Sequence, residues 1–193
     1  MIHLYIYKFN EEKEYDLDYK KLSQEVIDYV LPMNEIKRDL SIFSYYQLIK
    51  LLKEEYHIDK VELNFENKPR LVGDKYYFNI AHTDGMIVIA IADQEVGVDV
   101  EYKKRKIRAD LYKKVLSETE KLIYLRKNEM STYFLTCWVK KEAYLKYLGT
   151  GIDRHLDEID TESLSFVELI EEGDYVIGLC SKAKDLEIIH KSV

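Results

Sequence analysis

Cysteine is scarce in this chain of 193 residues, which contains only Cys137 and Cys180. Both lie in apolar segments, so we interpret them as small core residues, and their number argues against a disulfide framework and for a reducing compartment. No apolar run reaches the roughly 18 residues that would span a membrane. The segment 1–7 is too short and wrongly flanked for a signal peptide and is typical of a first strand. The sequence therefore predicts a cytoplasmic protein without a membrane segment.

A surplus of positive charge is also missing, because the formal net charge is -7 at pH 7. Proteins that bind nucleic acids are more often basic, so nothing in the composition indicates that class. An acidic total still permits an anionic ligand, provided that its site concentrates cations locally. With 47% hydrophobic residues, the chain is long enough for one large domain or two small ones.

Low-complexity linkers and internal sequence repeats are absent as well, so the order of the expected elements carries the prediction of architecture. Apolar periodicity predicts strands near 2–9, 61–65, 76–82, 86–92, 96–102, 164–170, 175–181 and 186–190, and helices near 18–30, 35–55, 109–115 and 131–148. Residues 117–120 (SETE) fit a capping box that opens one more helix. The sequence predicts an α+β protein of two packed halves, 1–95 and 96–193, with the active site in the cleft between them.

The helix expected at 131–148 carries charged residues where a helix built only for packing would not. Lys141 points into its apolar stripe, Glu142 lies on the border of that stripe, and Lys146 follows one turn later. This arrangement indicates a functional helix. The alternative is a surface pair between Glu142 and Lys146, with the stem of Lys141 buried and its ammonium reaching solvent.

Two carboxylates share one face of the strand expected at 96–102. Asp99 and Glu101 alternate with three valines, and Gly97 on their face leaves space beside them. Carboxylates at this spacing are about 7 Å apart and can share one hard cation. With Glu142 as a third ligand, they predict a Mg²⁺ site of the kind used on phosphoesters. The alternative is a solvated outer face.

Cations gather at two places in the sequence. His82 precedes a turn, and Lys68 and Arg70 come shortly before it, so the three could bind a phosphate together; an isolated turn histidine is the alternative. The basic run 103–108 directly follows the carboxylate strand. Its residues Lys103, Lys104 and Arg105 are candidates for contact with an acidic partner, and a solvated loop is the alternative.

Several motifs together resemble those of the Sfp-type 4′-phosphopantetheinyl transferases. They are FNIAHT at 78–83, VGVDVE at 96–101, and WVKKEAYLK at 138–146 followed by GTG at 149–151. Lys68 and Pro69 resemble the family's Gly-Lys-Pro motif, and 117–120 resembles its Ser-x-x-Glu helix start. The resemblance covers about residues 35–151, with the motifs in order and at plausible spacing.

This resemblance implies two similar α/β halves related by a pseudo-twofold axis in a monomeric chain. It implies that coenzyme A and Mg²⁺ bind in the cleft, and that a serine of an apo acyl or peptidyl carrier protein attacks the β-phosphorus and accepts the phosphopantetheine arm. Adenosine 3′,5′-bisphosphate is then released. Two other readings of the same three carboxylates are a metal-dependent phosphoester or pyrophosphate hydrolase and an inactive binding module for coenzyme A or carrier protein.

The roles that the resemblance implies can be stated residue by residue. Asp99, Glu101 and Glu142 would be the metal ligands, Glu142 would also be the candidate base, and Lys146 would offset charge on the pyrophosphate. Because Glu142 lies near a metal and a lysine, it is expected to stay ionised, which favours the ligand role. The implied coenzyme-binding residues are Lys68, Pro69, His82, Thr83, Lys146 and Lys37. Departures from the family pattern are Ala81 in place of serine, Asn67 in place of glycine, and Ser41 where an arginine is usual.

Overall fold

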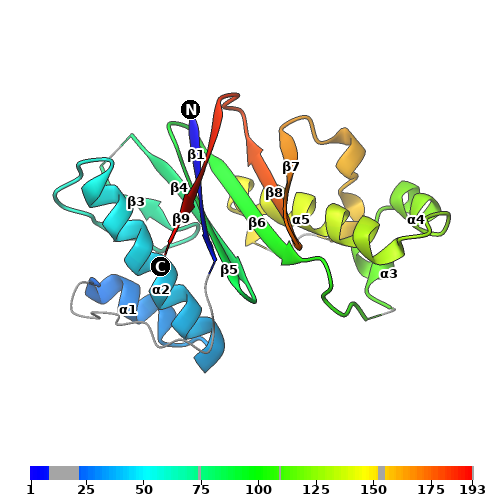
Figure 1. Cartoon of the computed structure of the whole chain (residues 1–193), viewed down its shortest axis with the longest axis horizontal. Coiled ribbons are helices and arrows are strands. Elements are labelled where there is room, and N and C mark those ends of the chain that lie inside the picture. Colours follow the sequence, from blue (N-terminus) through cyan, green and yellow to red (C-terminus); the bar gives the residue numbers. More distant parts are fainter. Residues whose placement is uncertain (9–21, 74, 109, 152–154, 193) are drawn as a thin grey trace.

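The computed structural model describes residues 1–8, 22–73, 75–108, 110–151 and 155–192. Two β-sheets pack against each other and are covered on their outer sides by helices, so that helix, sheet, sheet and helix follow one another across the molecule (Figure 1). This arrangement confirms the predicted α+β class, whereas the pseudo-twofold relation between two halves stays a prediction. No helix of the described residues combines the length and the apolar content needed to cross a membrane.

The order of the elements follows the predicted order closely. In chain order they are β1 (Ile2–Lys8), α1 (Gln24–Val30), α2 (Glu35–Glu54), β2 (Leu63–Asn64), β3 (Arg70–Leu71), β4 (Tyr77–Thr83), β5 (Met86–Ala92), β6 (Val96–Tyr102), α3 (Tyr112–Val115), α4 (Glu118–Tyr124), α5 (Met130–Leu148), β7 (Val167–Glu172), β8 (Tyr175–Ser181) and β9 (Leu186–Lys191). Two short 3-10 helices, Leu156–Glu158 and Thr161–Ser163, were not predicted. Residues 18–21 and 109 of two predicted helices lie outside the described residues.

The first sheet has the strand order β4-β5-β1-β9. Its strands are antiparallel except for β9, which pairs in parallel with β1 so that Ile2 lies opposite Leu186. The last strand of the chain therefore completes a sheet formed otherwise by residues before 95. The division of the chain at residues 95 and 96 stays a prediction.

The second sheet, β6-β8-β7, is antiparallel and packs on the inner face of the first. Val96, Val98 and Val100 of β6 lie in the core between the sheets, as the alternation predicted. Asp99 and Glu101 therefore face the other way, toward α5. The alternation along β6 alone determines which of its side chains face the core and which face α5, because successive side chains of a strand point to opposite faces.

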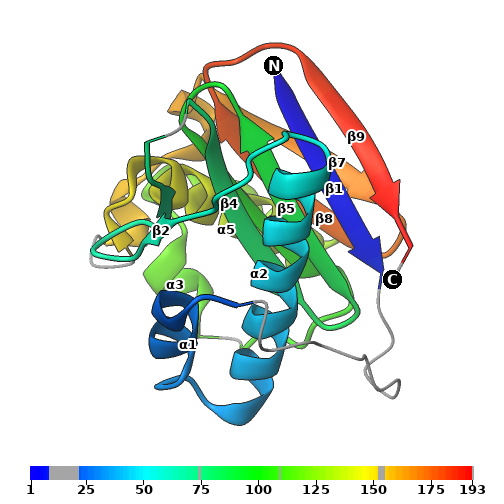
Figure 2. The same ribbon diagram turned by 90° about the vertical axis from the view of Figure 1, so that its left-hand side faces the viewer.

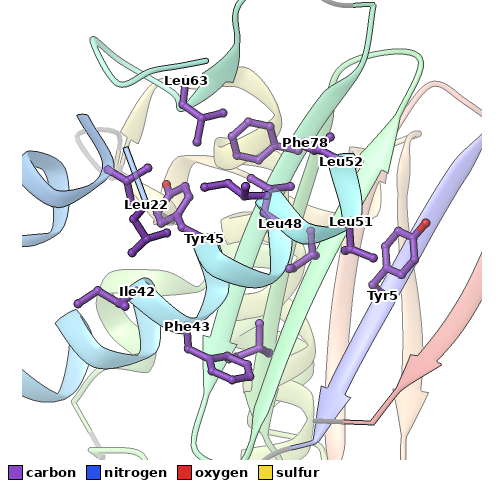
Figure 3. Packing of buried hydrophobic residues seen from close by; sticks show 14 of the residues in the cluster. Tyr5, Leu22, Ile42, Phe43, Tyr45, Leu48, Leu51, Leu52, Leu63 and Phe78 are labelled. Carbon is purple, nitrogen blue, oxygen red and sulfur yellow. The ribbon is translucent and has the colours of Figure 1, made fainter. Parts of the chain in front are cut away.

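Helix α2 covers the outer face of the first sheet, with α1 beside its N-terminal part (Figure 2). Asn34 caps the start of α2, because its side chain accepts a hydrogen bond from the backbone N–H of Lys37. Leu48, Leu51 and Leu52 of α2 are buried in one cluster with residues of the sheet (Figure 3). The cluster also includes Tyr5, Leu22, Ile42, Phe43, Tyr45, Leu63 and Phe78.

Helix α5 lies directly against the second sheet because two glycines remove the side chains that would separate them. A Cβ atom at Gly97 would overlap the backbone carbonyl of Ala143, and one at Gly178 would overlap that of Val139. The space predicted beside the carboxylates at Gly97 is therefore filled by the backbone of α5. The helix ends as predicted at Gly149, which has a left-handed φ of 71°.

Lys141 is fully buried on the core side of α5, so the prediction that it points into the apolar stripe is confirmed. Its Nζ donates to Glu120 Oε2 at 2.5 Å, to Val115 O at 2.6 Å and to Leu156 O at 3.0 Å. Glu120 also closes the predicted capping box with Ser117. The alternative of a lysine that reaches solvent is wrong, because all three donor positions of Lys141 have buried acceptors.

Candidate active site

Strand β6 and helix α5 bring Asp99, Glu142 and Lys146 together. Lys146 Nζ donates to Asp99 Oδ1 at 2.7 Å, so the alternative of a surface pair between Glu142 and Lys146 is wrong. Asp99, Glu101 and Glu142 are all at least 91% buried, with exposed fractions of 9%, 7% and 6%. The alternative of a solvated outer face is therefore wrong for these carboxylates.

Neighbouring cations balance only part of the negative charge of these carboxylates. Asp99 Oδ2 and Glu142 Oε1 are buried and have no hydrogen-bond partner among the described residues. Burial raises the pKa of Asp99, and the charge of Lys146 opposes that rise. Burial and the charge of Asp99 raise the pKa of Glu142 to about 7. Glu142 was expected to stay ionised beside a metal and a lysine; burial and the charge of Asp99 raise its pKa more than the charge of Lys146 lowers it.

Glu101 has a cation of its own. The guanidinium of Arg105, four residues later, donates to Glu101 Oε1. Burial raises the pKa of the Glu101 carboxyl, and the hydrogen bond and charge of Arg105 oppose this rise. The guanidinium carbon also lies 6.0 Å from the centre of the Trp138 ring. Arg105 therefore joins β6 to α5 at the edge of the site.

The three carboxylates fit a hard divalent cation in their chemistry but are not arranged as a finished cage. Among the residues with described positions, no group of three or more histidine, cysteine, aspartate and glutamate side chains is gathered closely enough to hold a metal ion. Lys146 and Arg105 occupy oxygens of two of them. The two unpartnered buried oxygens and the all-oxygen donor set nevertheless suit Mg²⁺. The metal-ligand roles of Asp99, Glu101 and Glu142 stay predictions.

A cavity of about 320 Å³ opens beside these residues. Glu142 and Lys146 line it, together with Lys68 and Pro69. Its other lining residues come from α1, α2, the turn before β3, β4, and the end of α5 with the residues that follow it. They are Tyr29, Tyr45, Asn67, Phe78, Asn79, Ile80, Leu145, Gly149 and Gly151.

Lys68 lies in the wall of the cavity, but its ammonium is engaged in the protein. Nζ donates to Glu95 Oε2 at 2.9 Å and to Val96 O at 2.7 Å, with a longer contact of 3.4 Å to Tyr147 O. These bonds tie the 67–69 turn to β6 and α5. They give Lys68 a structural role that the sequence did not indicate, and its predicted contact with coenzyme phosphates stays a prediction.

His82 lies half-buried at the end of β4, next to Thr83. Burial lowers the pKa of His82 to about 4, and the charges of Lys146 and Lys37 lower it further. The structure thus brings three predicted site residues, His82, Lys146 and Lys37, within electrostatic reach of one another. The imidazole is neutral at pH 7, so it would meet an anion as a hydrogen-bonding group rather than as an ion.

Each of the three predicted partner-binding residues has a carboxylate within the chain. Lys103 Nζ pairs with Glu171 and Lys104 Nζ with Asp174, both at 2.9 Å, and Arg105 holds Glu101. The first two pairs are exposed, and such pairs contribute only about 0–1 kcal/mol. They would exchange readily for the carboxylates of a partner, and the docking role stays a prediction.

The sequence did not single out Asn79, which connects β4 to β6. Its side-chain oxygen accepts a hydrogen bond of 2.9 Å from the backbone N–H of Val98, in a buried position. This bond fixes the carboxylate strand against the strand that carries His82. A buried amide in the middle of an apolar strand was the only signal available in the sequence.

The family model of the 4'-phosphopantetheinyl transferase superfamily matches residues 95–190, which include β6 and α5. The chain belongs to this superfamily. It is similar to 4'-phosphopantetheinyl transferase Sfp of Bacillus subtilis, with 29% identity over 136 residues, which cover 67% of this chain and 58% of the relative. It is also similar to the L-aminoadipate-semialdehyde dehydrogenase-phosphopantetheinyl transferase of Saccharomyces cerevisiae, with 36% identity over 77 residues, or 38% of this chain and 28% of that protein.

The similarity to these superfamily members does not extend over their whole length, since the chain spans 58% of the Sfp relative. Among solved structures, holo-[acyl-carrier-protein] synthase of Thermotoga maritima is similar at a TM-score of 0.33 and 20% identity. That match covers 44% of this chain and 60% of the synthase.

Proposed function

We propose that the chain transfers the 4′-phosphopantetheine arm of coenzyme A to a serine of an apo acyl or peptidyl carrier protein. The reaction requires Mg²⁺ and releases adenosine 3′,5′-bisphosphate. The observation that carries this proposal is the meeting of Glu142 and Lys146 in the wall of the cavity, with Asp99 buried behind them. The superfamily relatives, which are named as phosphopantetheinyl transferases, support the same reaction.

Asp99, Glu101 and Glu142 would hold the metal ion, which would offset charge on the pyrophosphate of the coenzyme. Their buried, partly unsatisfied oxygens support this assignment. A charged group inside the protein acts strongly, because the surrounding dielectric is low and the group needs little reorganisation during the reaction. Lys146 lies beside the same carboxylates and would stabilise charge that grows on the leaving α-phosphate.

Glu142 also suits the role of general base. A base works best when its pKa lies near the working pH, and burial brings the pKa of Glu142 to about 7. Glu142 lines the cavity, where the serine hydroxyl of a bound carrier would meet its carboxylate.

The phosphates of the coenzyme would lie at the His82 end of β4. The cations Lys146 and Lys37 act on His82, and a site for anions needs such a local concentration of positive charge in an acidic protein. The neutral His82 would donate a hydrogen bond to a phosphate oxygen, with Thr83 as its neighbour. Pro69 and the stem of Lys68 would border the adenine in the cavity.

The partner is a carrier protein, docked at Lys103, Lys104 and Arg105, rather than a nucleic acid or a membrane. The chain acts as a monomer in the cytoplasm, as two halves divided near residue 95.

Mass spectrometry of the carrier tests the reaction directly. The protein is incubated with coenzyme A, Mg²⁺ and an apo acyl carrier protein, and in parallel with an apo peptidyl carrier domain. We expect either carrier to gain the mass of phosphopantetheine and adenosine 3′,5′-bisphosphate to appear in equal amount. Cleavage of coenzyme A without a carrier would instead establish a hydrolase, and binding without turnover would establish a binding module.

One variant tests the metal site in this assay, and a second variant is its control. Asp99→Asn removes the charge but not the volume of the side chain, and we expect transfer to fall by about 100-fold or more. Lys127→Gln changes an exposed lysine near Tyr133, outside the cavity, and should leave transfer unchanged. Equal rates in Asp99→Asn and the unchanged protein would overturn the metal site.

A further inference from the structure

Arg105 is the least constrained member of the charge cluster around the carboxylates. Its side chain is 48% exposed, whereas the Glu101 carboxylate that it binds is 9% exposed. It belongs to a segment after β6 that forms neither a helix nor a strand. The guanidinium can therefore leave Glu101 by rotation of its own side chain, without any movement of β6 or α5.

The negative charge of three carboxylates in the cluster explains why Arg105 is held against Glu101. Asp99, Glu101 and Glu142 are buried together, and burial raises the pKa of each of them. Lys146 holds Asp99, Arg105 holds Glu101, and Glu142 keeps one buried oxygen without a partner among the described residues. Buried carboxylates are costly without counterions, so Arg105 supplies charge at the position where a divalent ion would supply it.

We propose that Arg105 is an exchangeable counterion of Glu101, which holds this carboxylate until a divalent cation takes its place. The inference rests on the proposed metal site and adds a residue to it. Binding of the metal would release the guanidinium from Glu101 and change its position over the ring of Trp138. Arg105 would then be available as a free cation beside Lys103 and Lys104, which are proposed to meet the carrier.

Arg105 and the metal ion would compete for the Glu101 carboxylate, and this competition determines whether removal of Arg105 strengthens or weakens Mg²⁺ binding. A group that occupies Glu101 only in the metal-free protein lowers the apparent affinity for the metal, by linkage. Removal of Arg105 should therefore tighten Mg²⁺ binding. Because the pair is half-exposed on the arginine side, we expect a tightening of about two- to fivefold.

Tryptophan fluorescence provides a direct readout of the movement. Trp138 is the only tryptophan of the chain, and the guanidinium carbon of Arg105 lies 6.0 Å from its ring centre. We expect Mg²⁺ to change the emission of Trp138, whereas NaCl at the same ionic strength should not. The NaCl series is needed because salt alone weakens exposed ion pairs.

Three variants separate the exchange from other causes. Arg105→Gln should lose the response of Trp138 to Mg²⁺ and bind Mg²⁺ more tightly by calorimetry. Arg108→Gln is the matched control, since it removes a nearby exposed arginine that pairs with Asp110 outside the site, and it should respond as the unchanged protein does. Asp99→Asn keeps the pair of Arg105 and Glu101 but weakens the metal site, so it should lose the response.

The outcomes distinguish this inference from the proposed function. If Mg²⁺ binds with the same affinity to Arg105→Gln and to the unchanged protein, and Trp138 does not respond, the exchange is overturned while transfer to the carrier stands. If neither protein binds Mg²⁺ with coenzyme A present, the metal site and the exchange are overturned together. A loss of the response in Arg105→Gln with tighter Mg²⁺ binding supports the exchange.

Discussion

The backbone carbonyl of Ala143 occupies the space that a side chain at Gly97 would need. Strand β6 and helix α5 approach each other at this point without any side chain between their backbones. The approach is the reason why Glu142 and Lys146 of the helix reach Asp99 of the strand. A residue without a Cβ atom thus determines the distance between the parts of the site.

The first prediction concerns this approach. Gly97→Ala should lower the free energy of unfolding by about 2 kcal/mol or more, because a methyl group must push α5 away from β6. It should also abolish transfer, since Lys146 would lose its contact with Asp99. Urea unfolding and the carrier assay measure the two effects.

Gly173→Asn is the control for this prediction. Gly173 has a left-handed φ of 58° and open space around it, and asparagine tolerates that conformation. We expect a change of less than about 0.5 kcal/mol and full activity. Unchanged stability and activity in Gly97→Ala would show that the close approach is not required.

The second prediction concerns the buried pair of Lys141 and Glu120. Lys141→Met should destabilise the protein by about 3–5 kcal/mol, because it leaves the buried carboxylate of Glu120 without its counterion. Lys121→Met, which breaks an exposed pair with Glu118, should cost less than about 1 kcal/mol. Chemical unfolding of both variants gives the comparison.

A second substitution tests the cause of that loss. Adding Glu120→Gln to Lys141→Met removes the orphaned charge and should recover part of the stability. No recovery would mean that lost packing of the lysine stem, rather than an unpaired charge, determines the stability.

The third prediction concerns the acid stability that His82 controls. Burial and the charges of Lys146 and Lys37 place the pKa of His82 at about 4, against an ordinary value of 6.5. Between these two values the unfolded chain binds a proton that the folded protein does not. Stability from this residue is therefore complete above pH 6.5 and is lost as the pH falls toward 4, by up to about 3 kcal/mol.

Comparison with His82→Gln isolates this contribution, since glutamine does not titrate. The difference in unfolding free energy between the unchanged protein and the variant should change between pH 6.5 and pH 4 and be constant above pH 7. His190→Gln, at an exposed position, is the control for histidine replacement in general. If the difference in unfolding free energy did not depend on pH, the pKa of His82 would not be lowered in the folded protein.

The fourth prediction separates two roles of Lys68. Its ammonium joins Glu95, the backbone of β6 and the end of α5, so Lys68→Met should lower the free energy of unfolding by about 1–3 kcal/mol. A lysine that served only to bind phosphate would change the KM for coenzyme A without changing stability. Lys50→Met on the exposed side of α2 is the control.

Local patterns in the sequence determined which face of β6 carries the site carboxylates, where α4 begins and where α5 ends. Alternation in β6 put Asp99 and Glu101 on one face, the capping box set the start of α4, and Gly149 ended α5. These features depend on the period of one strand or helix and on backbone conformation at single residues, so they can be read without knowledge of distant contacts.

The tertiary structure decided which charges meet. Lys68 is bonded to Glu95 and to the backbone of Val96, Lys146 to Asp99 rather than to Glu142, and β9 pairs with β1. The pKa of Glu142 follows from its burial and from the nearby charge of Asp99, and not from its position in the helix. Partners of this kind come from segments far apart in the chain, and burial and distance, which set the strength of a charge interaction, exist only once the chain has folded.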